Sequence, residues 1–161
     1  MRLFIMRHAE AELFAESDDT RSLTAHGHQQ AYRQGEWLKT HLKSTALSLS
    51  QILVSPYRRA LETFEQLNLA FNQTLQITEN WKEITPYGKA ELVVDYLSYL
   101  KQEKVEGVLL ISHLPLVAEI VAELYGKRNP INFYPATIVE LDWSDKKYAD
   151  IITFNYSSKI L

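Results

Sequence analysis

Short, mainly apolar runs recur along this chain, separated by longer segments in which apolar residues are spaced three or four apart. Apolar runs bounded by polar residues are typical of strands buried in a sheet, whereas the second spacing is typical of one face of a helix. Because the two kinds of segment alternate, we expect an α/β fold: a three-layer α/β/α sandwich with a mostly parallel, mixed sheet. The expected strands are residues 2–7, 51–54, 75–78, 107–112, 137–143 and 148–154.

Residue types suited to helix ends mark the segments between these strands. Thr24 can cap a first helix, Ser55 followed by Pro56 has the N-cap and first-position types for another, and Gly126 can end the last one. The helices are expected from 24 to about 42, from 56 onward, near 89–102, and from 113–115 to 126. The positions expected to face the core are Ala31, Gly35, Leu38 and Leu42 in the first helix and Leu61, Phe64, Leu67 and Phe71 in the second.

The composition narrows the possible functions. A chain of 161 residues is expected to form one domain, residues 1–161. No apolar stretch approaches the roughly 18–20 residues that span a bilayer, and the sequence starts on a strand without a targeting leader. We therefore expect a cytoplasmic protein that does not bind membranes. The absence of cysteine excludes disulfides, thiolate zinc sites and a cysteine nucleophile, and a net charge of −3 without a basic patch predicts no nucleic-acid binding.

Arg7 and His8 directly follow the first expected strand. The end of such a strand lies at the carboxyl edge of the sheet, where open α/β folds bind their ligands. Arginine matches two oxygens of a phosphate group, and its charge disfavours imidazolium, which leaves a ring nitrogen with its lone pair. The pair therefore suits a histidine that attacks phosphorus, although such a dipeptide also occurs by chance.

Two more segments repeat this order of strand end, polar residue and helix. Arg58 and Arg59 lie in a first helical turn, where each positive charge costs roughly 0.3–1 kcal/mol and an anion often binds; the alternative is a solvated pair. His113 follows Ser112 at the end of a buried strand, where it could contact phosphate or simply cap the next helix. Because the three strand ends would meet at one rim, we expect one phosphate site there.

Other polar residues carry weaker signals. Glu83, in the loop 79–88, could donate a proton to a leaving group or be a solvated carboxylate. His26 and His28 do not indicate a metal site, because side chains two apart on a helix diverge. The acidic run at 16–19 is expected to be a solvated loop, one that could meet a partner. We expect neither a metal nor another cofactor.

Several motifs along the chain resemble those of the histidine phosphatase superfamily, which has the phosphoglycerate-mutase-like fold. They occur in the family's order and span residue 1 to about 120. The matching motifs are Met6-Arg7-His8-Ala9-Glu10, Arg21-Ser22-Leu23-Thr24 with Gly27, Ser55-Pro56-x-x-Arg59-Ala60-x-x-Thr63, and Leu110-Ile111-Ser112-His113. Similarity to the small SixA-type protein phosphohistidine phosphatases is carried by Ser112-His113-Leu114-Pro115-Leu116-Val117 and Glu83-Ile84-Thr85-Pro86-x-Gly88.

This resemblance implies roles for four residues. His8 would be the nucleophile that becomes phosphorylated. Arg7 and Arg59 would bind the phosphoryl group, and His113 would complete the pocket.

Three further positions acquire an interpretation from the resemblance. Arg58 would be a secondary anion contact, and Glu83 falls in the region where relatives carry a proton donor. Ala9 stands where the family usually has glycine. If that position requires a positive φ, alanine there would cost roughly 1 kcal/mol or more.

The resemblance also implies a two-step, metal-independent phosphatase reaction through a phosphohistidine enzyme. Short connections leave little chain for lid insertions, so we expect a minimal member of the fold with an open rim. Such a rim would admit a histidine-phosphorylated protein, such as the phosphotransfer domain of a sensor kinase, and we expect the enzyme to be a monomer. Two alternatives stay open: a small-molecule phosphomonoesterase or mutase of the same superfamily, and a non-catalytic phosphate-binding regulator.

Overall fold

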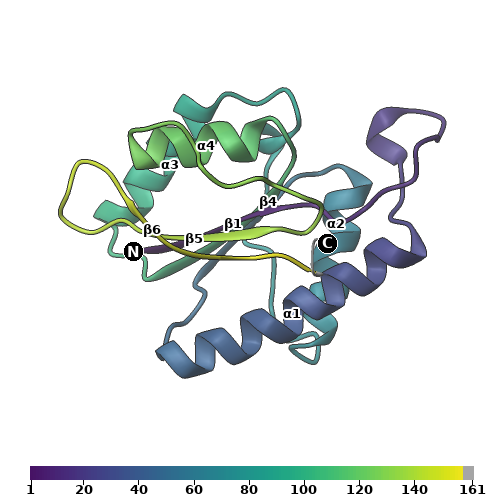
Figure 1. Cartoon of the computed structure of the whole chain (residues 1–161), viewed down its shortest axis with the longest axis horizontal. Helices are drawn as coiled ribbons and strands as arrows, with labels where there is room; N and C mark the ends of the chain where they lie inside the picture. Colours follow the sequence, from purple (N-terminus) through teal and green to yellow (C-terminus); the bar gives the residue numbers. More distant parts are fainter. Residues whose placement is uncertain (158–161) are drawn as a thin grey trace.

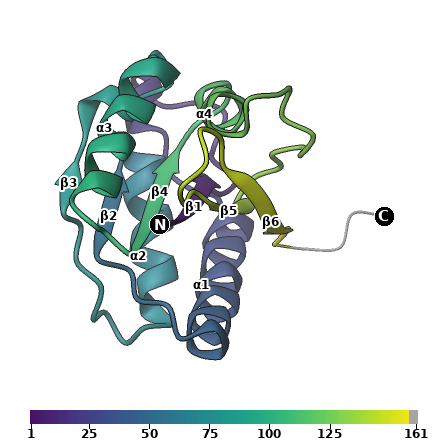
Figure 2. The same ribbon diagram turned by 90° about the vertical axis from the view of Figure 1, so that its left-hand side faces the viewer.

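A computed structural model of the protein describes residues 1–157 and shows a central sheet with helices on both faces (Figures 1 and 2). The strands are β1 (Arg2–Arg7), β2 (Gln51–Val54), β3 (Glu79–Asn80), β4 (Gly107–Ser112), β5 (Ile138–Asp142) and β6 (Asp150–Asn155). Helices α1 (Ala25–Thr45) and α2 (Arg58–Leu69) cover one face, α3 (Ala90–Gln102) and α4 (Leu116–Tyr125) cover the other, and η1 (Asp18–Thr20) and η2 (Lys82–Ile84) are 3-10 turns in loops. The predicted three-layer sandwich is confirmed.

The sheet has the strand order β3-β2-β4-β1-β5-β6 and is mixed, as predicted. The first four strands in this order are parallel, β5 runs antiparallel to β1, and β6 runs antiparallel to β5. Arg7 at the end of β1 pairs with Ser112 at the end of β4, and β2 ends beside them. The residues that follow these strands, His8, His113 and Ser55, therefore start at one carboxyl edge.

Helices on both faces bury β1 and β4. Leu3 and Ile5 of β1 belong to the apolar cluster under α3 and α4, while Phe4 and Met6 belong to the cluster under α1 and α2. β4 is buried along its whole length, as expected of a parallel strand covered on both sides. Two apolar clusters, one on each face, thus hold the central strands whose ends carry the polar residues.

The predicted helical faces are the ones that pack against the sheet. All four positions expected in α1 are buried. In α2, Phe64 and Leu67 are buried and Leu61 is half-buried, while Phe71 lies beyond the helix end and packs partly against the same cluster. Thr24 caps α1 with its hydroxyl, which accepts a backbone N–H one turn further on at 2.9 Å. Within residues 1–157, none of the helices has the length and apolar character needed to cross a membrane.

The second helix begins at Arg58, so the prediction that Ser55 is its N-cap and Pro56 its first residue is wrong. The Ser55 hydroxyl instead lies 2.7 Å from Nε2 of His113 and accepts the N–H of Tyr57 at 3.3 Å. Because this hydroxyl is hydrogen-bonded to the histidine that follows the neighbouring strand, it does not cap the helix. Tyr57 takes the N-cap position without a side-chain bond, and both arginines still fall in the first turn.

The third strand is Glu79–Asn80, so its prediction at 75–78 is also wrong. Thr78 pairs with Ile52 through both its backbone and its side chain: its N–H donates to the Ile52 carbonyl at 2.9 Å, and its hydroxyl accepts the N–H of Ile52 at 2.9 Å and donates to that carbonyl at 3.0 Å. The regular ladder starts only after Thr78, and residues 75–77 are not part of the sheet.

The remaining elements are confirmed with shifts of up to three residues at their ends. α1 continues to Thr45 rather than ending near Leu42. β6 starts at Asp150 rather than at Tyr148. Differences of this size are common at element ends, where the last hydrogen bonds fray.

Candidate active site

The structure brings four of the predicted site residues together at the carboxyl edge of β2, β4 and β1. His8, Arg59 and His113 are almost fully buried, with exposed fractions of 7%, 3% and 1%. The rings of His8 and His113 lie 5.1 Å apart between centroids, and Nε of Arg59 lies 3.3 Å from Nε2 of His8. Arg7 is close enough for its charge to act on both imidazoles.

Hydrogen bonds to the two ring nitrogens of His8 define its tautomer. Nδ1 lies 2.7 Å from the carbonyl oxygen of Ala9, which only accepts, so Nδ1 carries the proton. Nε2 faces the N–H of Arg59, which only donates, so Nε2 holds a lone pair. The ring is therefore neutral, with its unprotonated nitrogen directed at a guanidinium.

Burial and neighbouring cations keep both imidazoles neutral. Burial lowers the pKa of His8 to about 3; the bond to Ala9 opposes this shift in part, and the charge of Arg59 adds to it. Burial, then the His8 ring and Arg59, lower the pKa of His113 to about 2. Burial also lowers the pKa values of Arg7 and Arg59, but arginine stays charged in proteins. At neutral pH the site thus combines uncharged imidazoles with fixed positive charge.

Two buried nitrogen atoms of the site have no hydrogen-bond partner among residues 1–157: Nε of Arg7 and Nδ1 of His113. Nη1 of Arg7 is used, because it donates to the carbonyl of Phe133 at 2.9 Å. The Ser55 hydroxyl accepts from a backbone N–H, so its own proton is free for Nε2 of His113, which favours a proton on Nδ1. Buried donors nearly always meet an acceptor, so this pair indicates a site for an oxyanion.

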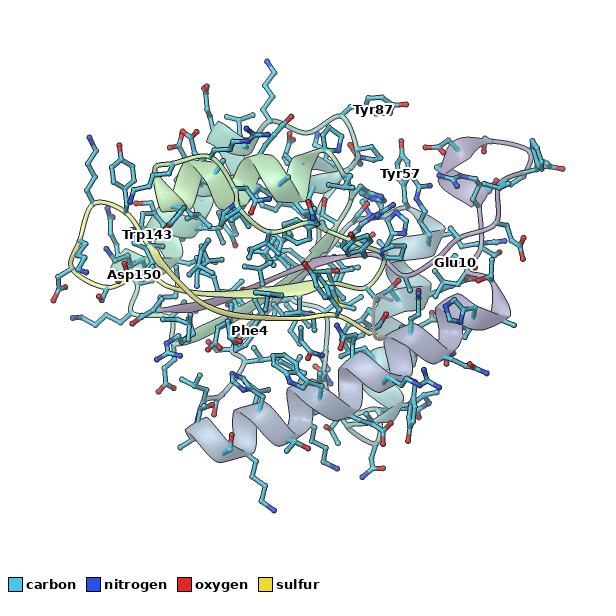
Figure 3. All side chains as sticks on the ribbon, in the orientation of Figure 1. Phe4, Glu10, Tyr57, Tyr87, Trp143 and Asp150 are labelled. Atoms are coloured by element: carbon cyan, nitrogen blue, oxygen red, sulfur yellow. The ribbon has the colours of Figure 1, made fainter. Side chains whose placement is uncertain are left out.

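Tyr57 forms one wall of the site (Figure 3). Its ring lies edge-on to His113, 5.1 Å between centroids. The guanidinium of Arg59 sits over the same ring at 5.0 Å, a cation–π contact that holds the arginine head. One aromatic side chain thus contacts both a histidine and an arginine of the site.

A hydroxyl links the segment after His8 to α2. Oγ1 of Thr63 accepts the N–H of Ala9 at 3.0 Å and donates to the carbonyl of Arg59 at 2.6 Å. Ala9 is fully buried and does not have a positive φ. Alanine in place of the expected glycine therefore adds no backbone strain at this position.

A strained residue supports the other side of the His8 backbone. Ala136 donates its N–H to the His8 carbonyl at 3.0 Å. It does so in the left-handed region, with φ of 64°, which costs alanine roughly 1 kcal/mol. Nε2 of the buried Gln34 donates to the Ala136 carbonyl at 2.7 Å and so stabilises this conformation.

Two charged residues of the loop before α1 also join the site. The sequence analysis placed Arg21 in a family motif and Asp18 in the acidic run but assigned neither to the site. Asp18 binds Arg59 twice, through its carbonyl oxygen (2.6 Å to Nη1) and its carboxylate (3.2 Å to Nη2). Arg21 donates from Nε to the same carboxylate at 2.9 Å. Burial acts to raise the pKa of Asp18, but Arg59 and Arg21 together hold it below its usual range. The acidic run at 16–19 is exposed, as expected, and Asp18 within it also pairs with the arginines of the site.

Arg58 and Glu83 form no side-chain hydrogen bond or ion pair with these residues in the described part of the chain. Arg58 is exposed and borders a hollow against the loop 12–22. Glu83 is half-buried in η2, and the hydrogen bonds and ion pairs of residues 1–157 do not include its carboxylate. The turn that carries it is fixed at the rim, because the Ile84 carbonyl accepts the Ser112 hydroxyl at 2.7 Å. The roles of both residues stay predictions.

The arrangement suits one kind of chemistry. Two guanidinium groups and a donor imidazole can bind the oxygens of a tetrahedral oxyanion. The lone pair of His8 Nε2 points into the same space and can attack the central atom.

Comparison with known proteins identifies relatives. The profile of the histidine phosphatase superfamily (branch 1) matches residues 3–93. A phosphohistidine phosphatase SixA homolog from Haemophilus influenzae is 60% identical over 149 residues, 91% of each chain. The solved structure of the protein histidine phosphatase SixA complexed with tungstate has a TM-score of 0.87 at 34% identity, covering 98% of this chain and 97% of that one. A phosphoglycerate mutase from Bacillus anthracis, 12% identical, covers 95% and 92% with a TM-score of 0.75, which shows the shared fold.

Proposed function

The chain belongs to the histidine phosphatase superfamily and is a phosphatase, and we propose that it hydrolyses phosphohistidine in proteins with His8 as its nucleophile. The names of the two SixA relatives support phosphohistidine as the substrate group. The fold and the level of identity to the Haemophilus influenzae protein support the same chemistry here.

One observation carries the proposal: Nε2 of neutral His8 presents a lone pair 3.3 Å from Nε of Arg59, among buried donors. A phosphoryl group bound by Arg59, Arg7 and His113 would have its phosphorus in front of that nitrogen. Tungstate, a tetrahedral oxyanion like phosphate, is the ligand named for the SixA complex, which supports this mode of binding.

In the first step, Nε2 of His8 forms a bond to phosphorus while the bond from phosphorus to the substrate imidazole breaks in line. The electron pair of the broken bond goes to the substrate imidazole, which takes up a proton from water. Arg7 and Arg59 balance the charge on the transferring oxygens, and His113 donates to one of them. His8 keeps its Nδ1 proton, and the Ala9 carbonyl stabilises the positive charge of the phosphorylated ring.

In the second step, water attacks phosphorus as the bond to Nε2 of His8 breaks and its electron pair returns to the nitrogen. The water proton passes to the departing phosphate or to bulk water, and neutral His8 is restored. Because burial and cations disfavour positive charge on this ring, the phosphorylated form is activated toward loss of its phosphoryl group.

The site also supports a protein as the substrate. An imidazole leaving group requires less help from a general acid than an alkoxide does, in keeping with a Glu83 carboxylate that makes no hydrogen bond among the described residues. We propose as substrate a histidine-phosphorylated protein such as the phosphotransfer domain of a sensor kinase. Its phosphohistidine would enter at the rim beside Tyr57 and Tyr87 (Figure 3).

The test is to incubate the enzyme with a phosphotransfer domain that carries ³²P on its histidine. Wild-type protein should release phosphate and, after a rapid quench, retain label that is acid-labile and alkali-stable. His8→Ala should lose turnover by on the order of 10⁴-fold or more, because the nucleophile is gone, and should retain no label.

The matched control is His26→Ala, which removes an exposed histidine at the start of α1 and should behave as wild type. Full turnover by His8→Ala would contradict the proposal. Faster turnover of 3-phosphoglycerate or sugar phosphates than of the phosphoprotein would favour a small-molecule phosphatase or mutase, and binding without turnover would favour a regulator.

A further inference from the structure

The loop between β1 and α1 carries two of the most exposed apolar residues of the described chain. Leu13 and Phe14 have exposed fractions of 78% and 89%. Figure 1 shows this loop, in purple, projecting beyond the carboxyl edge of the sheet. Exposing two adjacent apolar side chains to water is unfavourable, because the free energy that their burial would release is not gained. Such a pair therefore indicates a contact surface.

The loop is anchored rather than loose. Its two limbs pair at Ala11 and Leu23, and Arg21 donates to the Glu12 carbonyl at 2.9 Å. Asp18 ties its far limb to Arg59 at the centre of the site. Leu13 and Phe14 are therefore displayed at a defined distance from the phosphate site, which lowers the entropy cost of binding through them.

The rim opposite the loop is also apolar and exposed. Tyr87 has an exposed fraction of 80%, and Figure 3 shows it on the same side of the molecule as Tyr57. Leu114, next to His113, borders a hollow of about 480 Å³ together with Phe133. Apolar groups thus flank the site on both sides, with the buried histidines between them.

The negative charge of the loop indicates the kind of surface that can bind to it. Residues 10–19 contain five acidic residues and no basic one, and Asp18 among them pairs with arginines. Glu12, Glu16 and Phe14 border a hollow of about 360 Å³ together with one cation, Arg58. This surface complements apolar residues accompanied by lysine or arginine. A second copy of the chain meeting it through a two-fold axis would instead oppose two acidic loops.

Resting on the proposed function, we propose that Leu13 and Phe14 dock the phosphoprotein substrate, by packing against a helix that presents phosphohistidine beside apolar and basic residues. A protein that brings a phosphoryl group to His8 comes close to this loop, because Asp18 on its far limb contacts Arg59 at the centre of the site. The loop then contributes to affinity for a protein and nothing to the reaction of a small molecule.

The experiment measures turnover of two substrates, a phosphotransfer domain phosphorylated on histidine and the small molecule phosphoramidate, by wild type, Leu13→Ser and Phe14→Ser. Each variant should lower kcat/KM for the phosphoprotein by roughly tenfold or more, through KM. Turnover of phosphoramidate should stay within twofold of wild type. Raised salt should increase KM for the phosphoprotein in wild type, because the loop is acidic.

Tyr99→Ser is the matched control, since Tyr99 is also exposed but lies near the far end of α3; both substrates should react as with wild type. Unchanged KM in the loop variants, or an equal loss on both substrates, would overturn the docking role and leave the proposed function intact. A dimer that Phe14→Ser dissociates would assign the surface to a second copy. Hydrolysis of phosphoramidate but not of the phosphoprotein by wild type would remove both proposals.

Discussion

Each nitrogen of the His8 ring has its own neighbour, and this division prepares the residue for attack. The Ala9 carbonyl accepts the proton on Nδ1, and the Arg59 guanidinium faces the lone pair on Nε2. The arginine beside this lone pair cannot protonate it, because it gives up no proton in the physiological range. The same cation that would bind the phosphoryl group thus also keeps the nucleophile free.

At the residue scale, the sequence predicted the site residues that follow regular strands. It did not predict the site residues that lie in the irregular loop. Arg7, His8 and His113 could be brought together in advance, because parallel strands end at a common edge. The positions of Asp18 and Arg21 could not be predicted in this way, because a loop has no regular repeat that would show which helix it contacts. The ion pairs of Asp18 with Arg21 and with Arg59 depend on the path of the chain in space.

Asp18 competes with an anion for the guanidinium of Arg59. Asp18→Asn keeps the size of the side chain and removes its negative charge. We therefore expect inorganic phosphate to inhibit the variant more strongly, with an inhibition constant roughly two- to fivefold lower. Inhibition of phosphoramidate hydrolysis at low salt measures this constant.

Asp19→Asn is the matched control, because the Asp19 carboxylate accepts from the Ser17 hydroxyl and, within residues 1–157, forms no hydrogen bond or ion pair with Arg59. Its inhibition constant should equal that of wild type. A constant that rises in Asp18→Asn would show that Asp18 chiefly positions the arginine.

At the element scale, the crossing of α1 and α2 sets the position of Arg59. Gly35 lies at this crossing, where an added Cβ would come within 2.3 Å of the Leu67 carbonyl oxygen. The backbones of the two helices therefore approach more closely than any side chain at position 35 allows. Sequence analysis placed Gly35 on the inward face, but the need for glycine there follows only from the crossing.

Gly35→Ala should separate the helices and lower the free energy of unfolding by roughly 1–3 kcal/mol, despite the better helix propensity of alanine. Urea denaturation followed by circular dichroism measures the change. Glu36→Ala, at the exposed neighbouring position, should stay within about 0.5 kcal/mol of wild type. An unchanged midpoint for Gly35→Ala would mean that the crossing relaxes freely.

The two wrong predictions at this scale have a common cause. Ser55 and Thr78 were read from local rules for helix caps and strands, but both hydroxyls bond to neighbouring segments. When a polar side chain forms hydrogen bonds to a segment far away in the sequence, these bonds outweigh its local preference for a cap or a strand. A single sequence does not show which segment that is. The periodic apolar faces, which depend on burial alone, were predicted correctly.

At the scale of the whole molecule, the two buried histidines couple folding to pH. Their pKa values, about 3 and about 2 in the folded protein, return to about 6.5 on unfolding. Below pH 6.5 the unfolded chain therefore binds protons that the folded chain does not, so stability falls as pH falls. Full stability from this source is present above pH 6.5.

Between pH 7 and pH 5, each of these histidines should cost roughly 2 kcal/mol of unfolding free energy. His8→Asn keeps a donor for the Ala9 carbonyl and should reduce the loss by about that amount. Urea denaturation at both pH values measures it, with His26→Asn, at an exposed position, expected to keep the wild-type slope. Equal slopes for wild type and His8→Asn would show that His8 takes up its proton without unfolding.

The place of β1 between β4 and β5 has a consequence for synthesis on the ribosome. The strand emerges before both of its partners, which lie more than 100 residues later in the chain. Its apolar side chains must therefore stay unpaired, or be shielded by chaperones, until those partners have been translated. A nascent chain that stops before Gly107 carries His8 and Arg59 but lacks β4, the strand that would hold them at one edge, so phosphatase activity should arise late and all at once.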